Sequence, residues 1–525
     1  MVNFKDPKII RQLRFVFILF LGFTSGLPLA LTGQTMQAWL TIEKIEVATI
    51  GFFSLVGLPY TFKFLWAPLM DRFEPPLFGR RRGWIIISQL LVAAMLILLS
   101  QMGPATNTQL FALIAVSVAF FSASQDIVID AYRSDILDPD QRGLASSLTV
   151  LGYRLAMILS GGIAFIWADP AGRNMSWPEI YMVMAKVMMV AAVICFFVLP
   201  KVKADNKAPN TNAKNDLIGF IALVAVAIIG YQFTTRVATP LMQYLLTPSE
   251  AIADVAKAGN IKKWIDLIAL YLGIAATIPL AWYVSTKTKF ETLNLSLKNY
   301  FSNNGAVAFL VLIILYKVGD AFAGALTTNF LINGAHFTQA EVGVVNKVIG
   351  MWMTIIGAIL GGAIMFRIGL YRALLAFGIL QLLSNFGFWQ LAVSGRDIWG
   401  SFTLPAFDWV IVSLKESSQV DYLLLYAVGF ENITGGMGTS ALLALLMSLC
   451  NQKFSATQFA FLSSLASTGR VWVGPLAGVL VTSVGWPLFF IISVAAAVPG
   501  LLMLVKMRNQ VRLLEAPKIS ALADD

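Results

Sequence analysis

The segment Phe120–Gly162, FFSASQDIVIDAYRSDILDPDQRGLASSLTVLGYRLAMILSGG, contains two apolar stretches that carry ionisable side chains. The first stretch includes Asp126 and Asp130, a polar connection follows, and the second stretch includes Arg154. An ionisable side chain is expensive in hydrocarbon, so one inside an apolar segment is a functional candidate. The segment therefore predicts two membrane helices with a functional charged site on them.

The two aspartates are four positions apart, which places both carboxyls on one helix face with a rise of roughly 6 Å. A neighbouring like charge and a dry environment both favour the protonated form of a carboxyl group. We therefore expect Asp126 and Asp130 to take up and release protons. The alternative is a buried ion pair with Arg154 or Lys63 that fixes helix packing, so that one aspartate is paired and the other titrates.

The composition is that of a membrane protein. Of the 525 residues, 58% are hydrophobic and 13% are charged, whereas soluble proteins contain about 25% charged residues. Long apolar runs recur along the whole chain, which predicts an all-α polytopic membrane protein. Lys and Arg gather in alternate short loops, so we expect both termini in the cytoplasm and attribute the net charge of +10 to orientation in the bilayer, not to nucleic-acid binding.

Residue types that metal or enzyme sites use are scarce. The only histidine is His336, and the two cysteines fall in or at the end of apolar segments. The sequence contains no phosphate-binding glycine loop and no arrangement of nucleophile and base. We expect no enzymatic activity, no metal and no cofactor, with the proton motive force as the energy source.

The apolar segments predict about 14 transmembrane helices. Residues 1–200 form a first group of six, residues 304–507 form a second, and 508–525 are a cytoplasmic tail. The polar segment at the start of 201–303 predicts a cytoplasmic linker, and two extra transmembrane helices follow within that range. We also expect a short polar turn that contains Gln34, Gln37, Trp39 and Glu43. The predicted helices cover about 13–33, 48–70, 84–102, 109–132, 144–167, 178–199, 217–246, 264–284, 304–332, 340–366, 371–393, 421–449, 456–483 and 486–507.

The two groups of six carry matching motifs. SSLTVLGYR (Ser146–Arg154) in the first group corresponds to SSLASTGR (Ser463–Arg470) in the second. Two six-helix halves joined by a cytoplasmic linker are the major facilitator architecture, in which the substrate site lies near the midplane between the halves.

The loop after the second predicted helix, WAPLMDRFEPPLFGRRRG (Trp66–Gly83), resembles the signature loop of the major facilitator superfamily. A carboxylate that faces arginines near a helix end can hold two halves together. We expect Asp71, Arg72, Arg80 and Arg81 to form a cytoplasmic gate. Simple orientation by basic charge is the alternative.

The remaining intramembrane charges have an excess of cations, which suits an anionic substrate. Flat aromatic rings and amides suit sugar rings, although packing or an interfacial belt would also explain the aromatics. The expected substrate-binding residues are Arg154, Lys317, Lys347, Arg470, Lys63, Gln125, Asp320, Tyr153, Gln37, Trp39, Asn346 and Glu431. For each charged residue taken alone, a structural role is an equal alternative.

Long segments in both halves strongly resemble the AmpG family of muropeptide permeases. They are Gly22–Leu40, Thr49–Trp84, Phe120–Leu137, Leu151–Gly162, Leu315–Leu331, Glu341–Gly350 and Phe454–Leu465. The resemblance implies a multi-pass protein of the bacterial inner membrane, surrounded by lipid. It implies import of GlcNAc-1,6-anhydroMurNAc peptides, driven by protons and by rocking of the two halves. Imported anhydromuropeptides would feed cell-wall recycling and signal induction of chromosomal β-lactamase, which confers antibiotic resistance.

Two alternatives to muropeptide import stay open. One is a major facilitator for another bulky anion, such as an acyl-coenzyme A. The other is a membrane sensor that binds muropeptides without transporting them. We expect the partners to be the substrate, protons and lipid, with no nucleic acid, and we expect a monomer.

Overall fold

The computed structural model describes residues 7–67, 70, 75, 79–136, 142–200, 213–247, 255–288, 290, 298, 301–302, 305–408, 413–449 and 455–514. Within them, 13 helical segments are long and apolar enough to cross a membrane. The last of these contains Gly485, whose φ of 76° marks a kink between two helices. The predicted all-α fold with about 14 spans is therefore confirmed.

The first half contains the six predicted spans, several of them broken into shorter helices. Its elements are α1 (Pro7–Leu31), α2 (Gln34–Ile42), α3 (Val47–Phe52), η1 (Phe53–Gly57), α4 (Leu58–Phe62), η2 (Lys63–Leu65), α6 (Arg80–Gln101), α7 (Thr108–Ile136), α8 (Arg142–Met157), η4 (Ile158–Ile163), α9 (Ala164–Ala168) and α10 (Trp177–Val198). Ser176 and Glu179 form a capping box that starts α10.

The sequence analysis was wrong about residues 34–43, which it predicted as a polar turn. They form the helix α2, and Met36, Ala38, Trp39 and Leu40 on it are buried in the core. The polar residues misled the prediction because they alternate with core residues on the same helix: Gln34 is exposed, whereas Gln37 is half-buried and bonds to Ala325. The first span therefore continues past Gly33 to Ile42.

The second half repeats the arrangement. Its elements are α15 (Ala306–Ala325), α16 (Thr327–Asn329), η7 (Phe330–Gly334), α17 (Gln339–Glu341), η8 (Val342–Ile349), α18 (Gly350–Ile368), α19 (Leu370–Ser394), α20 (Tyr422–Leu449), α21 (Ser455–Lys506) and α22 (Arg508–Leu513). Four short strands lie between α19 and α20: β1 (Ser401–Leu404) pairs antiparallel with β4 (Ser418–Asp421), and β2 (Phe407–Asp408) pairs antiparallel with β3 (Ser413–Leu414).

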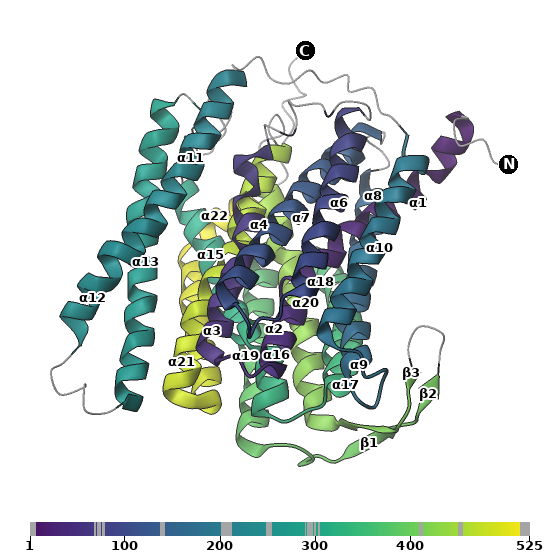
Figure 1. The fold of residues 1–525 in the computed structure, drawn as a ribbon, viewed down its shortest axis with the longest axis vertical. Helices are drawn as coiled ribbons and strands as arrows, with labels where there is room; N and C mark the ends of the chain where they lie inside the picture. Colours follow the sequence, from purple (N-terminus) through teal and green to yellow (C-terminus); the bar gives the residue numbers. More distant parts are fainter. Residues whose placement is uncertain are drawn as a thin grey trace.

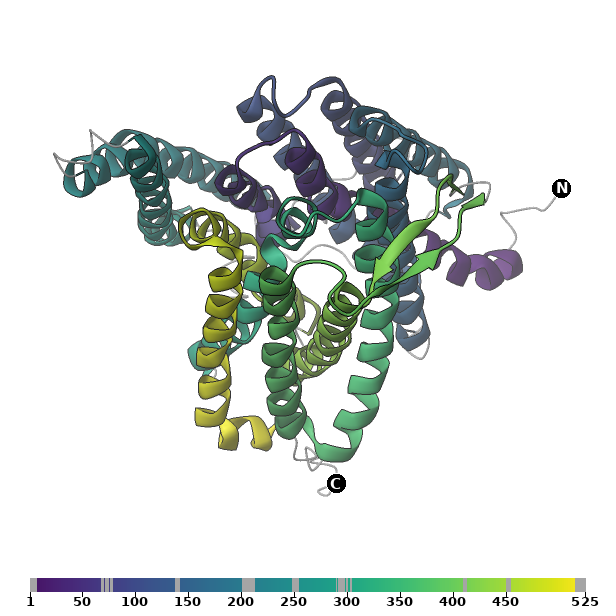
Figure 2. The ribbon, with the colours of Figure 1, turned by 90° about the horizontal axis from the view of Figure 1, so that it is seen from below.

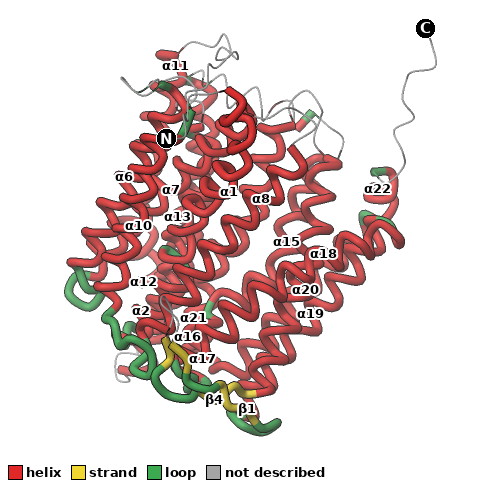
Figure 3. The backbone as a smooth tube through the Cα atoms, turned by 90° about the vertical axis from the view of Figure 1, so that its right-hand side faces the viewer, coloured by secondary structure: helices red, strands yellow, loops and turns green. Residues whose placement is uncertain are grey.

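Figure 2 shows the first half in purple and blue beside the second half in green and yellow. In Figures 1 and 3 the strands lie at one end of the bundle, whereas α1 begins at the opposite end. We call these the strand end and the terminal end. Helices α1 and α8 pack closely in the first half, and α15 and α21 do so in the second.

The segment between the halves forms α11 (Ala213–Phe233), η5 (Thr234–Ala238), α12 (Thr239–Leu246) and α13 (Val255–Lys287). This extra pair lies at one edge of the bundle, beside α21 (Figures 1 and 2). Most of its apolar side chains are exposed, for example Ile221, Tyr244 and Trp282, as expected of helices that face lipid.

The two halves meet through small residues and π-helical turns. A Cβ added to Gly51 on α3 would lie 2.5 Å from the carbonyl oxygen of Gly474 on α21, so the backbones of the two halves are in contact there. The π-helix η4 packs against the π-helix η8 across the interface. Such turns occur often at functional sites.

Candidate functional site

Asp126 lies on α7 and faces α1. The Oγ atom of Ser25 on α1 donates a hydrogen bond to Oδ1 of Asp126. One position earlier, Nε2 of Gln125 donates to Oγ1 of Thr24 over 3.1 Å. Two neighbouring polar contacts thus join α1 and α7 inside the first half.

The two aspartates have different surroundings. The Asp126 side chain is partly buried, whereas that of Asp130 is 57% exposed. Oδ1 of Asp130 forms an ion pair over 3.2 Å with Arg133, one turn further along α7, a partner that the sequence analysis did not consider. The structure thus distinguishes a paired Asp130 from an Asp126 held by a hydroxyl group.

Lys347 brings charge to the interface between the halves. It lies on η8 and is only 2% exposed, and its Nζ atom donates to Oε1 of Gln34 on α2. Nζ also lies 5.7 Å from the centre of the Phe165 ring on α9, an arrangement that favours a cation. A buried lysine of the second half therefore contacts two residues of the first half.

Other predicted site residues lie near this interface. Nη1 of Arg154 on α8 lies 3.2 Å from the sulfur of Met351 on α18, across the interface. Oε2 of Glu431 accepts from Nδ2 of Asn432 over 2.8 Å. Asn346 adjoins Lys347 on η8, and its Nδ2 is buried without a partner among the described residues.

Lys317 and Asp320 form an ion pair of their own on α15. Nζ of Lys317 lies 3.0 Å from Oδ2 of Asp320 and 3.2 Å from Oγ1 of Thr439 on α20. Two predicted substrate-binding residues thus pair with each other on one helix.

Two predicted substrate ligands take part in packing within the first half, and the side chain of a third is not described. Trp39 is fully buried, and its ring packs against Phe111 and Tyr181 within the first half. The backbone oxygen of Tyr153 would lie 2.5 Å from a Cβ on Gly26, so this position serves the close contact between α1 and α8. Arg470 lies on α21, and its side chain is outside the described residues.

Half of the predicted gate is outside the described residues. Asp71 and Arg72 are not among them, and of Arg80 only the backbone is described, at the start of α6. Arg81 follows on the same helix and is partly buried. Its neighbour Arg82 donates to the carbonyl oxygen of Phe196 at the end of α10.

Direct hydrogen bonds close the strand end between the two halves. Nε2 of Gln37 on α2 donates to the carbonyl oxygen of Ala325 over 2.7 Å. Nδ2 of Asn329 on α16 donates to Oγ1 of Thr41 over 2.9 Å. Gln37, predicted as a substrate ligand, here joins the halves.

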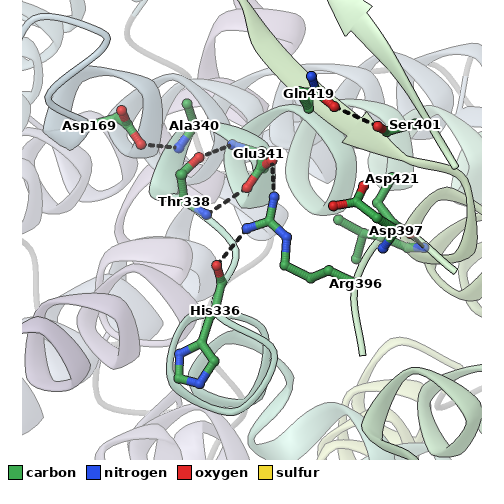
Figure 4. Close-up of polar contacts among 11 residues, drawn as sticks. Asp169, His336, Thr338, Ala340, Glu341, Arg396, Asp397, Ser401, Gln419 and Asp421 are labelled. Carbon is green, nitrogen blue, oxygen red and sulfur yellow. Dashed lines mark hydrogen bonds and ion pairs between the residues drawn. The ribbon is translucent and has the colours of Figure 1, made fainter. Parts of the chain in front are cut away.

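A second closure lies beside it (Figure 4). Asp169, at the end of α9, is 3% exposed, and its Oδ2 accepts from the backbone N–H of Ala340 over 2.7 Å. Ala340 is in the first turn of the continuous helix formed by α17, η8 and α18, where a carboxylate is stabilised by the helix dipole. The backbone N–H of Lys415 donates to the carbonyl oxygen of Ala171 over 2.7 Å, so the strand region also reaches the first half.

The start of that helix is fixed from its own half. Thr338 and Glu341 form a capping box. Nη2 of Arg396 donates to Oε1 of Glu341 over 2.8 Å, and Nη1 donates to the carbonyl oxygen of His336 over 2.6 Å (Figure 4). The acceptor Asp169 therefore meets a rigidly held N-terminus.

The sequence analysis missed Ser25, Gln34 and Asp169 as site residues. Ser25 could have been found from its position in the first apolar segment, as a polar side chain that must find a partner inside the bundle, whereas Gln34 was assigned to the polar turn that follows. Asp169 carries no such signal, because it follows a helix end like many solvated aspartates. Among the described residues, no group of three or more His, Cys, Asp or Glu could hold a metal ion.

Comparisons with known proteins agree with this architecture. Residues 14–414 match the model of the Major Facilitator Superfamily. A crystal structure of a POT family transporter in complex with 5-aminolevulinic acid superposes with a TM-score of 0.64 at 14% identity, covering 95% of this chain and 96% of the other. The peptide transporter POT in complex with sulfate gives a TM-score of 0.60 at 14% identity, covering 95% of each chain. These likenesses show the fold.

The sequence relatives are more specific. The chain is 41% identical over 502 residues to the anhydromuropeptide permease of Escherichia coli (strain K12), and the alignment covers 96% of this chain and 81% of that protein. It is 28% identical to the putative transporter AmpG 4 of Rickettsia conorii, covering 96% and 99%. The chain therefore belongs to the AmpG family of permeases within the Major Facilitator Superfamily, as a multi-pass membrane transporter.

Proposed function

We propose that this protein imports anhydromuropeptides across the bacterial inner membrane together with protons. The observation that supports the substrate most directly is the 41% identity to the E. coli anhydromuropeptide permease over nearly the whole chain. The substrates are GlcNAc-1,6-anhydroMurNAc peptides, whose import would serve cell-wall recycling and β-lactamase induction. The distribution of Lys and Arg supports a cytoplasmic terminal end, which places the strand end in the periplasm.

Asp126 is the proton-binding residue in this proposal. It lies inside the span Thr108–Arg133 and is held by Ser25. A small change in this environment can shift the balance between its charged and neutral forms. Asp130, in its ion pair with Arg133, modulates the site from the terminal side.

The cations at the interface would bind the peptide carboxylates. Lys347 belongs to the second half and contacts Gln34 and Phe165 of the first, so substrate binding there can be transmitted to the relative orientation of the halves. Moving a net anion into a negative cytoplasm costs about 2.3 kcal/mol per charge per 100 mV. Each accompanying proton removes one such charge, so import without an electrical penalty needs at least as many protons as net negative charges on the substrate.

The closed strand end fits rocker-switch alternating access. With the strand end in the periplasm, the contacts of Gln37, Asn329 and Asp169 seal the site from the periplasm. Outward opening would break these contacts and let the substrate enter between the halves. Closure after binding would restore them.

The test is uptake of labelled anhydromuropeptide into proteoliposomes under an imposed pH gradient. The native chain should accumulate substrate, whereas Asp126→Asn should catalyse exchange without gradient-driven accumulation. Asp408→Asn, in the exposed strand β2, is the matched control and should behave as the native chain. Equal accumulation by native and Asp126→Asn chains would contradict the role of Asp126.

The same vesicles decide between the alternatives. Coenzyme A esters should not compete with anhydromuropeptide, and competition by them would favour transport of another bulky anion. Binding without counterflow in the native chain would favour a sensor.

A further inference from the structure

A small polar cavity lies inside the second half, away from the contact between the halves. It is lined by α15, α19 and α21, and its walls include Tyr316, Asp320, Gln381, Asn385 and Leu501. The space open to the centre of a water-sized sphere is about 10 Å³, which is room for about one water molecule.

The polar wall of this cavity comes from α19. Gln381 is 5% exposed and Asn385 is 1% exposed. Nε2 of Gln381 and both Nδ2 and Oδ1 of Asn385 have no hydrogen-bond partner in the described part of the chain. Buried amides are normally satisfied, so these three atoms indicate a small polar guest in the cavity.

The hydrogen-bonding groups of the walls indicate which small molecule fits the cavity. Two of the three atoms are donors and one is an acceptor, which suits a water molecule because water both donates and accepts. A metal cation would find oxygen ligands in Asp320 and Asn385 but would be repelled by the ammonium group of Lys317, 3.0 Å from Asp320. A water molecule in this cavity would therefore lie beside Asp320.

Asp320 is arranged so that it can change its charge. Its partner Lys317 also donates to Oγ1 of Thr439 over 3.2 Å, so this ammonium group keeps a neutral acceptor when the carboxylate is protonated. Tyr316 on the same helix donates its own hydroxyl to the carbonyl oxygen of Leu374 over 3.0 Å. The other walls near Asp320 present the amides of α19 and the apolar side chains of Ala497 and Leu501 on α21.

We propose that Asp320 is a second proton-binding residue, reached through a water molecule held by Asn385 and Gln381. The carboxylate takes a proton from this water, and the water regains one from the solution. The ammonium group of Lys317 then keeps its hydrogen bond to Thr439. Release reverses the same steps. The proposal rests on proton-coupled import and adds a second proton to the one bound at Asp126.

The experiment measures the number of protons moved per anhydromuropeptide, from the reversal potential of uptake in proteoliposomes at several imposed pH gradients. In Asp320→Asn the ratio should fall by one, while KM for the substrate stays within about twofold. Asn385→Leu, which removes the water-binding amide at similar volume, should slow proton uptake at least about tenfold with Asp320 in place. Infrared difference spectra should lose one carboxylic C=O band in Asp320→Asn and keep it in Asp408→Asn.

Three results would overturn the proposal. An unchanged proton ratio in Asp320→Asn would do so, and so would a loss of substrate binding at an unchanged ratio, which would make Asp320 a substrate ligand. Retention of every carboxylic band would show that Asp320 does not bind a proton. If the native chain itself moves no protons, the proposed symport fails as a whole, which is distinguishable because the native ratio is measured first.

Discussion

Lys347 is a buried lysine whose Nζ atom donates to a neutral amide, that of Gln34. A charged group in such a place has capacity left for an anion, and hydrogen bonds to charged groups contribute about 1.5–3 kcal/mol. We expect Lys347→Gln to raise KM for anhydromuropeptide about tenfold, which is about 1.4 kcal/mol, with a smaller effect on kcat. Initial rates of uptake over a range of substrate concentrations measure both constants.

Gln34→Ala is the matched control, because it removes the same contact between the halves and keeps the charge. Its KM should stay within about twofold of the native value. An equal rise in both variants would show that Lys347 joins the halves and does not bind substrate.

Gly51 shows how closely the elements of the two halves pack. A Cβ at this position would lie 2.5 Å from Gly474 O and 2.8 Å from Gly478 Cα, both backbone atoms of α21. Gly51→Ala must therefore push α3 away from α21, and we expect uptake to fall more than about tenfold, the effect of a loss of about 1.4 kcal/mol. Gly103→Ala, where a Cβ would meet nothing within 4 Å, should leave uptake unchanged. Native-like uptake by Gly51→Ala would mean that this contact is not needed in the transport cycle.

The bond from Asp169 to the start of α17 is a contact between elements that should break when the strand end opens. Asp169→Asn keeps the shape and removes the charge that the helix N-terminus favours, a loss of about 1 kcal/mol. We expect the population open at the strand end to rise about fivefold. Spin labels at Thr106 and Glu416, in a cysteine-free background, report the distance between the halves by electron paramagnetic resonance.

Glu179→Gln provides the comparison, since Glu179 caps α10 within the first half and bonds only to Ser176 in the described contacts. It should leave the distance distribution as in the native chain. If Asp169→Asn also leaves the distribution of label distances unchanged, the remaining contacts at the strand end are sufficient to hold it closed.

At the scale of the whole molecule, the extra pair of helices contacts both halves. Lys263 on α13 forms an ion pair with Glu46 of the first half. Trp264 Nε1 donates to Ser483 Oγ over 3.1 Å, and Tyr271 OH donates to Trp472 O over 2.7 Å, both in α21 of the second half. The pair therefore bridges the halves from the outside.

Surface ion pairs contribute about 0–1 kcal/mol and single neutral hydrogen bonds about 0.5–1.5 kcal/mol. These contacts hold α13 against the outside of the bundle and involve none of the residues proposed to bind protons or substrate, so the triple variant Lys263→Ala, Trp264→Phe, Tyr271→Phe should change the uptake rate by less than about tenfold and keep the native proton ratio. Proteoliposome uptake measures both. Loss of the proton gradient's effect on uptake would instead place α13 in the coupling mechanism.

The sequence alone determined the fold class, the spans and the family. Apolar runs long enough to cross a bilayer and the alternation of basic loops are local properties, so they are visible without any contact between distant residues. Asp126 and Asp130 were recognisable for the same reason, because a carboxylate in an apolar segment is anomalous by itself.

Only the tertiary structure decided how these residues are used. Ser25 bonds to Asp126 from 101 positions away, and Gln34 bonds to Lys347 from 313 positions away. Trp39 looked like a ligand because its neighbours are polar, but the packing of α2 places its ring in the core. Asp169 looked like an ordinary helix end until Ala340 of the other half was found beside it. Which side chains meet depends on how the helices cross. The sequence of a single helix shows that it spans the membrane, but it does not show which residues of neighbouring helices it will contact.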